Sequence, residues 1–455
     1  MTAGPLPGDV AIPPKPPRNG PLTLAEAFDP RANAIGFLRW FLAFAVIFSH
    51  AGPLGDFYGG HDLGVQWSSE QSFGGVAVAG FFAISGFLIT NSRMGRSTVF
   101  RYFWRRAVRI FPAFWAALLL TAFVLGPVAW RKERGTWSGY FSADVDSPLT
   151  YFSNNMFLRF YQKNIAEMGA GNPLGVKGGF DWNGSAWTLI YEFKGYFIIG
   201  VLGLFGILFY KKVVALLMAF MLVLNTMLWG NFGQTDYLAP LFRNYFNVMM
   251  LTPFFFGMLL AIYADKVVID DRLALAAGGV AFFTYFIGSG WNLYGQFGYI
   301  YVLFWLAIRL PLIHWEKYGD FSYGIYIYAW PLMQFGAYFG LHEAGWLVYH
   351  LVIVVAVHIL AFISWHVLEK RALALKNWTP AWLAAILRRT KPLEDRIAYA
   401  IVNPDFSSTR LAARIRADQA ALASEAQHEA MVTHDIAERT HSVRRAPVHD
   451  DSTKP

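Results

Sequence analysis

The chain has 455 residues, of which 55% are hydrophobic, 18% aromatic and only 15% charged. Soluble domains carry about 25% charged residues, so this composition excludes an ordinary water-soluble enzyme and a disordered or collagen-like chain. Because the sequence has no cysteine, disulfides, cysteine-ligated zinc and thiol catalysis are also excluded. The formal net charge of +8 becomes informative only when it is located along the chain.

Residues 1–33 are polar and rich in proline, with neither an apolar core nor a small-residue cleavage site. These features are not those of a signal peptide, so we expect a retained and flexible cytoplasmic tail.

Ten apolar stretches of about 20 residues follow, long enough to cross the hydrocarbon core of a membrane. They predict an all-α fold, a polytopic transmembrane helix bundle within residues 34–376. The expected spans are roughly 34–51, 73–91, 110–130, 185–208, 213–230, 244–263, 273–290, 298–314, 321–341 and 345–368.

Positive charge orients these spans, because short cytoplasmic loops are enriched in Lys and Arg. The loop between the second and third spans holds six arginines, whereas residues 52–72, 291–297 and 342–344 hold no Lys or Arg. We therefore expect both termini on the cytoplasmic side, and a multi-pass protein of the bacterial inner membrane.

Two segments lie outside this bundle pattern. The long outer segment 131–184 has mixed charge and an aromatic middle, and we expect it to shape the outer face of any site. Residues 377–455 read as a cytoplasmic tail, helical around 411–430 and disordered after 442, whose basic character suits contact with anionic lipid.

Ionisable residues inside spans are costly to bury, so each is a candidate for function. Arg39 and His50 lie eleven residues apart, on nearly the same helix face and about 16 Å apart along the axis. A histidine near the outer end of a span can act as a general base near neutral pH. The alternative is an interfacial histidine satisfied by headgroups and water.

Glu192 lies in the outer third of its expected span, at a depth similar to that of His50. A carboxylate there could orient His50 or stabilise its imidazolium form. Alternatively, Glu192 and Lys194 form an internal structural pair, although residues two apart do not share a helix face.

Arg106 and Arg109 are three residues apart, on one face at the inner mouth of the third span. Two guanidinium groups in this position suit a phosphate ligand. The alternative is that they only set the topology, as inner-loop arginines commonly do.

Seven motifs in order resemble the bacterial membrane acyltransferase-3 family. They are Arg39 followed by His50, Phe81-Phe82 with Ser85-Gly86-Phe87-Leu88-Ile89, Arg106-x-x-Arg109-Ile110-x-Pro112, Trp187-Thr188-Leu189 with Glu192, residues 254–260, residues 322–326 and residues 364–370. Two positions depart from the family pattern: Ala79-Gly80 stand where an acid often precedes the two phenylalanines, and Arg371 stands where a proline is common.

The resemblance implies transfer of an acyl group, by default acetyl, from acyl-coenzyme A to a hydroxyl of an envelope carbohydrate or glycolipid. It implies that His50 is the catalytic base, assisted by Glu192 and Arg39, and that Arg106 and Arg109 contact the phosphates of coenzyme A. Many relatives carry a soluble transferase domain after the membrane region. Residues 377–455 are too short for one, so a stand-alone membrane module is expected.

Two other classes of protein remain open from the sequence. A proton-coupled or lipid transporter of the cell envelope also uses intramembrane His, Arg and Glu, although the two halves show no repeat. A non-catalytic envelope scaffold is the third possibility. No phosphate-binding loop or dinucleotide fingerprint is present, and neither a metal nor a nucleic-acid partner is expected.

Overall fold

The computed structural model describes residues 21–68, 70–94, 98–229, 244–379, 382 and 384–385. The chain divides into a unit of residues 1–381 and a unit of residues 382–455, and the fold described below belongs to the first. The predicted tail helix at 411–430 lies outside the described residues.

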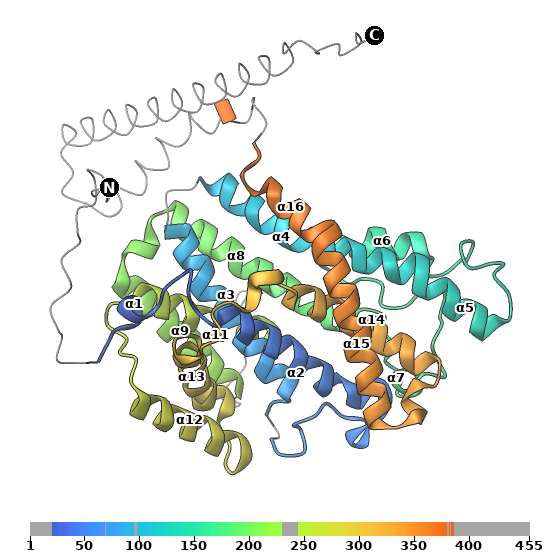
Figure 1. The fold of residues 1–455 in the computed structure, drawn as a ribbon, viewed down its shortest axis with the longest axis horizontal. Coiled ribbons are helices and arrows are strands. Elements are labelled where there is room, and N and C mark those ends of the chain that lie inside the picture. The colour runs from blue at the N-terminus through green and yellow to red at the C-terminus, as the bar shows by residue number, and fades with distance from the viewer. Residues whose placement is uncertain are drawn as a thin grey trace, which may run out of the picture. The chain divides into compact units, whose positions relative to one another are not determined.

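In the described residues, all regular structure is helical apart from isolated β-bridges. The helices, drawn in Figure 1, are α1 Leu24–Ala27, α2 Ile35–Gly55, α3 Phe73–Met94, α4 Val99–Leu120, α5 Gly126–Arg134, α6 Pro148–Asn155, α7 Pro173–Val176, α8 Leu189–Leu204, α9 Lys211–Trp229, α11 Tyr245–Ile262, α12 Asp271–Phe286, α13 Gln296–Arg309, α14 Ser322–Tyr338, α15 Trp346–Ser364 and α16 Lys370–Ala374. The prediction of an all-α helix bundle is confirmed.

Seven helical segments are long and apolar enough to cross a membrane. They are α2, α3, 99–134, 184–204, α9, α11 and 346–377, and each overlaps one of the expected spans. The other three expected spans coincide with α12, α13 and α14, which have 16, 14 and 17 residues. The count of ten spans and the inward orientation of the termini remain predictions.

The expected arginine-rich loop is largely helix, which corrects the sequence prediction. Arg101, Arg105, Arg106 and Arg109 lie on α4, which begins eleven residues before the expected span. The side chain of Thr98 caps this helix by accepting a hydrogen bond from the backbone of Arg101. Arginine is a good helix former, so the charged residues interrupt the hydropathy signal but not the helix.

The described part of the N-terminal segment is docked on the bundle. The backbone amides of Leu24 and Ala25 donate to the carbonyls of Val267 and Ala264, at 2.7 and 2.9 Å. Leu24 is fully buried. The bundle therefore holds the chain already at Leu24 and Ala25, about ten residues before the first expected span.

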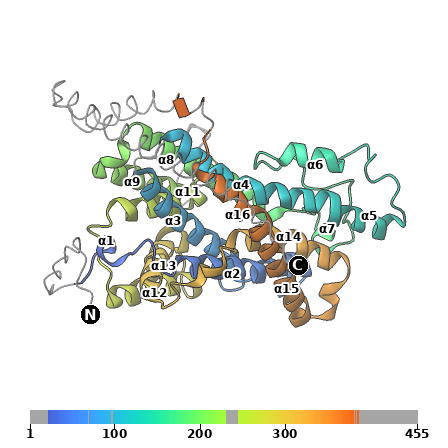
Figure 2. The same cartoon turned by 45° about the horizontal axis from the view of Figure 1, so that its top comes forward.

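Helices α6 and α7, which belong to the expected outer segment, and α5, which leads into it from the third expected span, gather at one end of the bundle in both ribbon views (Figures 1 and 2). Helix α6 contacts α4, and α7 contacts α2. This segment therefore packs on the same helices that carry Arg106 and His50.

Helices α2 and α14 run in the same direction, because residues further along α2 contact residues further along α14. Arg39 on α2 contacts Asp320, just before α14, and His50 packs on Trp330 with ring centroids 4.9 Å apart. Helix α14 thus links the two candidate residues of α2.

Helices α3 and α11 pack so closely that glycine is required on both. A Cβ atom added to Gly86 would lie 2.0 Å from the carbonyl oxygen of Phe254. A Cβ atom on Gly257 would lie equally close, at 2.0 Å, to the carbonyl oxygen of Ala83. Small residues allow this approach of two backbones, as in many membrane helix pairs.

The Gly257→Ala variant should therefore lose about 1–3 kcal/mol of stability through overpacking. Thermal unfolding of the detergent-solubilised protein measures the loss as a lower midpoint. The matched control is Gly279→Ala on α12, where an added Cβ meets nothing within 4 Å. Equal midpoints for the two variants would contradict the close packing of α3 on α11.

Candidate active site

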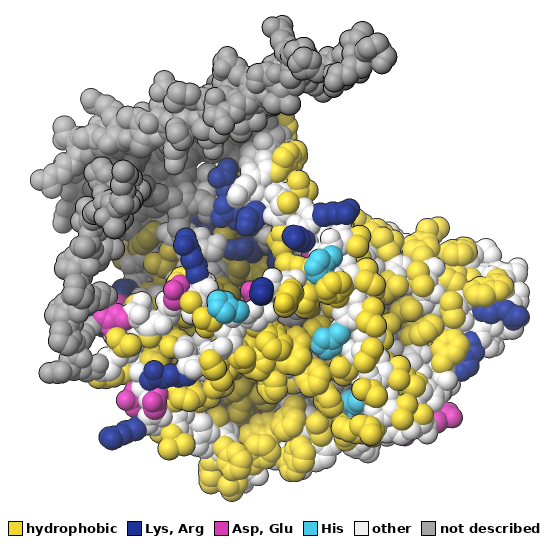
Figure 3. Space-filling view, in the orientation of Figure 1, with side chains coloured by type: hydrophobic (Ala, Val, Ile, Leu, Met, Phe, Trp, Pro, Cys, Tyr) yellow, Lys and Arg dark blue, Asp and Glu magenta, His cyan; other side chains and the backbone are white. Residues whose placement is uncertain are grey.

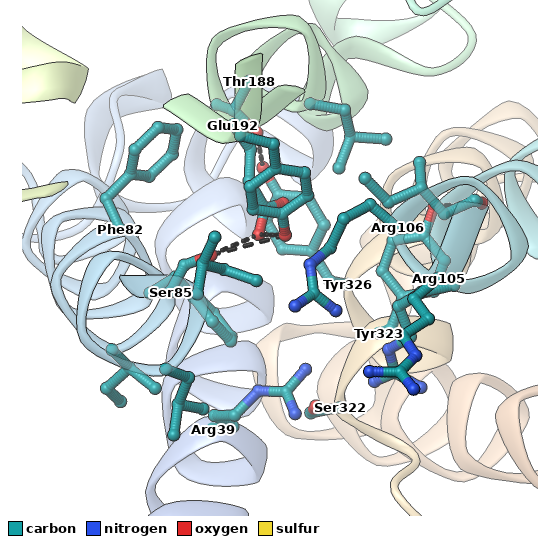
Figure 4. Close-up of a pocket in the computed structure, with 18 of the residues that line it drawn as sticks. Arg39, Phe82, Ser85, Arg105, Arg106, Thr188, Glu192, Ser322, Tyr323 and Tyr326 are labelled. Atoms are coloured by element: carbon teal, nitrogen blue, oxygen red, sulfur yellow. Dashed lines mark hydrogen bonds between the residues drawn. The ribbon is translucent and has the colours of Figure 1, made fainter. Parts of the chain in front are cut away.

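A cavity of about 400 Å³ lies among α2, α3, α4, α8 and α14 (Figure 4). Helix α3 forms one wall with a continuous stripe of side chains that follows the helical repeat over four turns. The stripe is Val78, Phe81, Phe82, Ser85, Leu88, Ile89 and Ser92.

One end of the cavity is strongly basic. Arg105, Arg106 and Lys376 line it, and none has a carboxylate within 4 Å among the described residues. Arg106 donates to the hydroxyl of Ser92 at 2.7 Å, and its guanidinium lies 5.2 Å from the ring centre of Tyr102. Figure 3 shows Lys and Arg side chains gathered around a hollow where α4 and α16 lie. This end suits an anionic ligand.

Arg39 and Arg109 also line the cavity, but both are already paired. Arg39 donates to Asp320 at 2.6 Å, Arg109 donates to the same carboxylate, and Arg109 lies 3.8 Å from Glu369. Burial alone would raise the pKa of Asp320, but the guanidinium groups of Arg109 and Arg39 outweigh it and hold the pKa well below its usual range. The ionised Asp320 thus balances much of the charge of two arginines.

Glu192 lies in the middle of the cavity wall. Its Oε1 atom accepts hydrogen bonds from the hydroxyl of Ser85, at 2.9 Å, and from that of Tyr196 (Figure 4). The alternative pair with Lys194 is absent, since the Nζ atom of Lys194 donates to Asn247 at 2.8 Å.

The expected depth of Glu192 is wrong. Gly74 on α3 lies against His50, whereas Ser85, the partner of Glu192, is eleven residues further along α3. The two levels are therefore about 16 Å apart. Glu192 does not contact His50, so the expected orientation of His50 by this carboxylate is also wrong.

The far end of the cavity is aromatic. Its lining there includes Val78, Phe81, Thr188 and Tyr326. The rings of Phe81 and Tyr326 meet edge to face with centroids 5.9 Å apart. The Tyr326 hydroxyl is fixed by Thr188 at 2.6 Å and by the carbonyl of Ser185 at 2.7 Å.

His50 lies just beyond this end and is held by an aspartate that the sequence reasoning missed. Its Nδ1 atom lies 2.7 Å from Oδ1 of Asp62, in the loop after α2. The hydroxyl of Ser49 donates to the same oxygen at 3.3 Å and accepts from the amide of Gly74 at 2.9 Å. The His50 side chain stays 20% exposed.

Electrostatics keep Asp62 ionised. Burial alone would raise the pKa of this carboxyl, but the His50 imidazole and the Ser49 hydroxyl outweigh it and hold the pKa below its usual value. A carboxylate on Nδ1 leaves Nε2 free to exchange a proton, and this arrangement is the one that a histidine base needs. No described residue forms a hydrogen bond with Nε2.

A model of a known family, described as an acyltransferase domain, matches residues 33–366, well over half of the chain. The chain belongs to the acyltransferase-3 family. An O-acetyl transferase of Shigella phage Sf6 is 28% identical over 313 residues, which cover 67% of this chain and 86% of the relative. Nodulation protein 10 of Rhizobium leguminosarum bv. viciae is 25% identical over 363 residues, which cover 76% of this chain and 94% of the relative. No solved structure matches the chain.

Family membership and the apolar helices together make the protein a multi-pass membrane acyltransferase, and the O-acetyl transferase relative supports O-acyl transfer. The transporter and scaffold alternatives are therefore set aside. Of the residues that the family resemblance implied, Arg39, Arg106, Arg109 and Glu192 line one cavity, and His50 lies one turn of α3 beyond it.

Asp62 and Asp320 are the two main additions of the structure to this acyltransferase site. Neither was found by the sequence reasoning, because each is a loop residue without a motif of its own. A search for acids beside the expected spans would have reached both, because Asp62 is in the loop after the span of His50 and Asp320 directly precedes the span that begins at residue 321.

Replacement of Asp320 by Asn should cost about 3–5 kcal/mol of stability, because it leaves two buried arginines without their shared counter-charge. The matched control is Asp56→Asn, which removes an exposed partner of Lys177, at 2.8 Å, and should cost less than about 1 kcal/mol. Thermal unfolding of both variants in the same detergent measures the difference. If Asp320→Asn unfolds at the wild-type temperature, the ion pairs do not stabilise the bundle.

Proposed function

We propose that this acyltransferase moves an acyl group, by default acetyl, from coenzyme A to a hydroxyl of an envelope carbohydrate or glycolipid. The observation that carries the proposal is a cavity with a histidine–aspartate pair just beyond one end and, at the other end, cations that no carboxylate of the described residues pairs. The printed name of the phage relative, an O-acetyl transferase, supports the nature of the group and of the bond formed.

The phosphates of the donor would bind at the basic end of the cavity. Arg105, Arg106 and Lys376 suit this role best, because no carboxylate in the described residues neutralises them. Arg109 was the expected partner of Arg106, but its pairing with Asp320 favours a structural role. We therefore assign phosphate binding to Arg105, Arg106 and Lys376.

The flexible arm of coenzyme A would follow the stripe on α3. Glu192, Ser85 and Tyr196 offer hydrogen-bonding groups midway along the wall, which suit the amides of that arm. Arg39 lies about 16 Å from His50 along α2. We therefore assign Arg39 to the donor path and not to the reacting carbonyl.

The thioester would react at the His50 end of the cavity. Nε2 of His50 takes the proton of the acceptor hydroxyl, and the acceptor oxygen bonds to the carbonyl carbon. The carbon–sulfur bond breaks, and the thiolate takes the proton back from the imidazolium. Asp62 stabilises that imidazolium while it exists. The products are an acyl ester and free coenzyme A, and no net proton is released.

The donor and acceptor sides of this proposal match the expected inner-membrane topology. Acyl-coenzyme A is cytoplasmic, and the basic end of the cavity lies at the expected cytoplasmic ends of α3 and α4. Residues 52–72, which include Asp62, form an expected outer loop. The acceptor would therefore approach from the outer face.

The His50→Gln variant should lower kcat about 10²–10⁴-fold, because it removes the base. The assay is transfer of label from radioactive acetyl-coenzyme A to an envelope glycan fraction by the purified protein. His366→Gln is the matched control, since His366 lies on the same bundle, bonds to the carbonyl of Phe362 at 2.9 Å and packs its ring on Phe321 and Phe362, but does not line the cavity. Equal transfer by wild type and His50→Gln would exclude His50 as the base.

Asp62→Asn should lower kcat nearly as far as His50→Gln and leave the KM for the donor unchanged. The amide preserves the shape of the side chain but not the charge that stabilises the imidazolium. The measurement is the separate dependence of transfer on donor and on acceptor concentration. An altered donor KM with an unchanged kcat would show that Asp62 does not act through His50.

Arg106→Gln should weaken binding of coenzyme A about ten-fold or more, because one charge-assisted hydrogen bond contributes roughly 1.5–3 kcal/mol. Calorimetric titration of the purified protein with coenzyme A measures the change. Arg131→Gln, at the exposed end of α5, is the control for loss of one positive charge. Unchanged affinity in Arg106→Gln would remove this residue from the donor site.

A further inference from the structure

A cluster of three aromatic residues adjoins the basic end of the cavity. The ring centroids of Trp104 and Trp378 lie 5.8 Å apart, and Phe100 stacks on Trp104 at 6.4 Å with an angle of 7° between the rings. Trp378 is 54% exposed and Phe100 is 36% exposed. The cluster therefore presents open ring surface beside the cavity.

Hydrogen bonds fix this cluster to the cavity mouth. The indole N–H of Trp104 donates to the carbonyl of Leu375 at 2.8 Å. Arg105 donates to the side chain of Asn377 at 3.0 Å. Helix α4 is thus tied to the segment after α16, and Trp378 is held at a defined place against Trp104.

Aromatic and basic residues lie within two positions of each other in both of these segments. On α4, Trp104 directly precedes Arg105 and Arg106, which line the cavity. After α16, Lys376 lines the cavity and Trp378 follows two residues later. Open aromatic surface therefore lies next to the cations to which the proposed function assigns the donor phosphates.

A planar base joined to phosphates is the ligand chemistry that fits such a pair of surfaces, because every base can stack on an aromatic ring. We propose that Trp378, backed by Trp104, is the stacking platform for the adenine of the coenzyme A donor. This inference rests on the proposed function and makes it more specific. The donor is then a free coenzyme A thioester, and not an acyl carrier protein, whose phosphopantetheine arm has no base.

Tryptophans also anchor membrane proteins at the interface between lipid and water. An anchor and a stacking platform differ in one measurable respect. An anchor does not distinguish ligands that carry adenine from ligands that lack it, whereas a platform acts only on those that carry it.

The experiment compares two ligands on the full-length protein in detergent. Dissociation constants for coenzyme A and for 4′-phosphopantetheine, which lacks the nucleotide, are measured by calorimetry for wild type and Trp378→Ala. We expect Trp378→Ala to weaken coenzyme A binding about 5- to 100-fold and to leave 4′-phosphopantetheine binding unchanged. Trp378→Phe keeps a ring and should recover most of the affinity.

Trp137→Ala is the matched control, because Trp137 is similarly exposed, at 59%, but lies in the segment after α5. It should bind both ligands as the wild type does. Loss of affinity for both ligands alike in Trp378→Ala, or for neither, would overturn the adenine platform while the donor assignment stands. Failure of the wild type to bind either ligand would overturn the donor assignment itself, and this inference with it.

Discussion

The close packing of α3 on α11 is the constraint on which the cavity depends. Because Gly86 and Gly257 bring the two backbones together, α3 has one rotation about its axis that avoids a clash. That rotation turns Ser85 and Ser92 toward α4 and α8 and brings Gly74 against His50. These two glycine contacts thus set the wall of the cavity and the approach to the proposed base, although they take no part in the chemistry.

The charges at the cavity fall into two groups with different consequences. Asp320 and Glu369 neutralise Arg39 and Arg109. The protein itself therefore offsets the free-energy cost of burying these two positive charges. Arg105, Arg106 and Lys376 have no such partner among the described residues. Arg105 and Arg106 bond instead to the side chains of Asn377 and Ser92, which leaves their charge available to the ligand proposed above.

Hydropathy was sufficient to locate the helices of the bundle, because a span needs only a run of apolar residues of the right length. Hydropathy missed the start of α4, because the arginines there lower the hydropathy of the segment but do not break the helix. It also misjudged the depth of Glu192, because a window of sequence does not show how one helix is shifted against another. The partner of His50 was missed for a different reason: Asp62 lies in the loop after α2, twelve residues from His50, and no motif marks it. The family motifs located the residues, but not the contacts among them.

The aromatic end of the cavity has a consequence for the cell. A pathway open at both faces of the inner membrane would conduct water and ions and would dissipate the gradients on which the cell depends. Phe81 and Tyr326 meet in the lining of the cavity, and two hydrogen bonds hold the tyrosine in place. The acyl transfer proposed above would then leave no open path for water and ions between the two compartments.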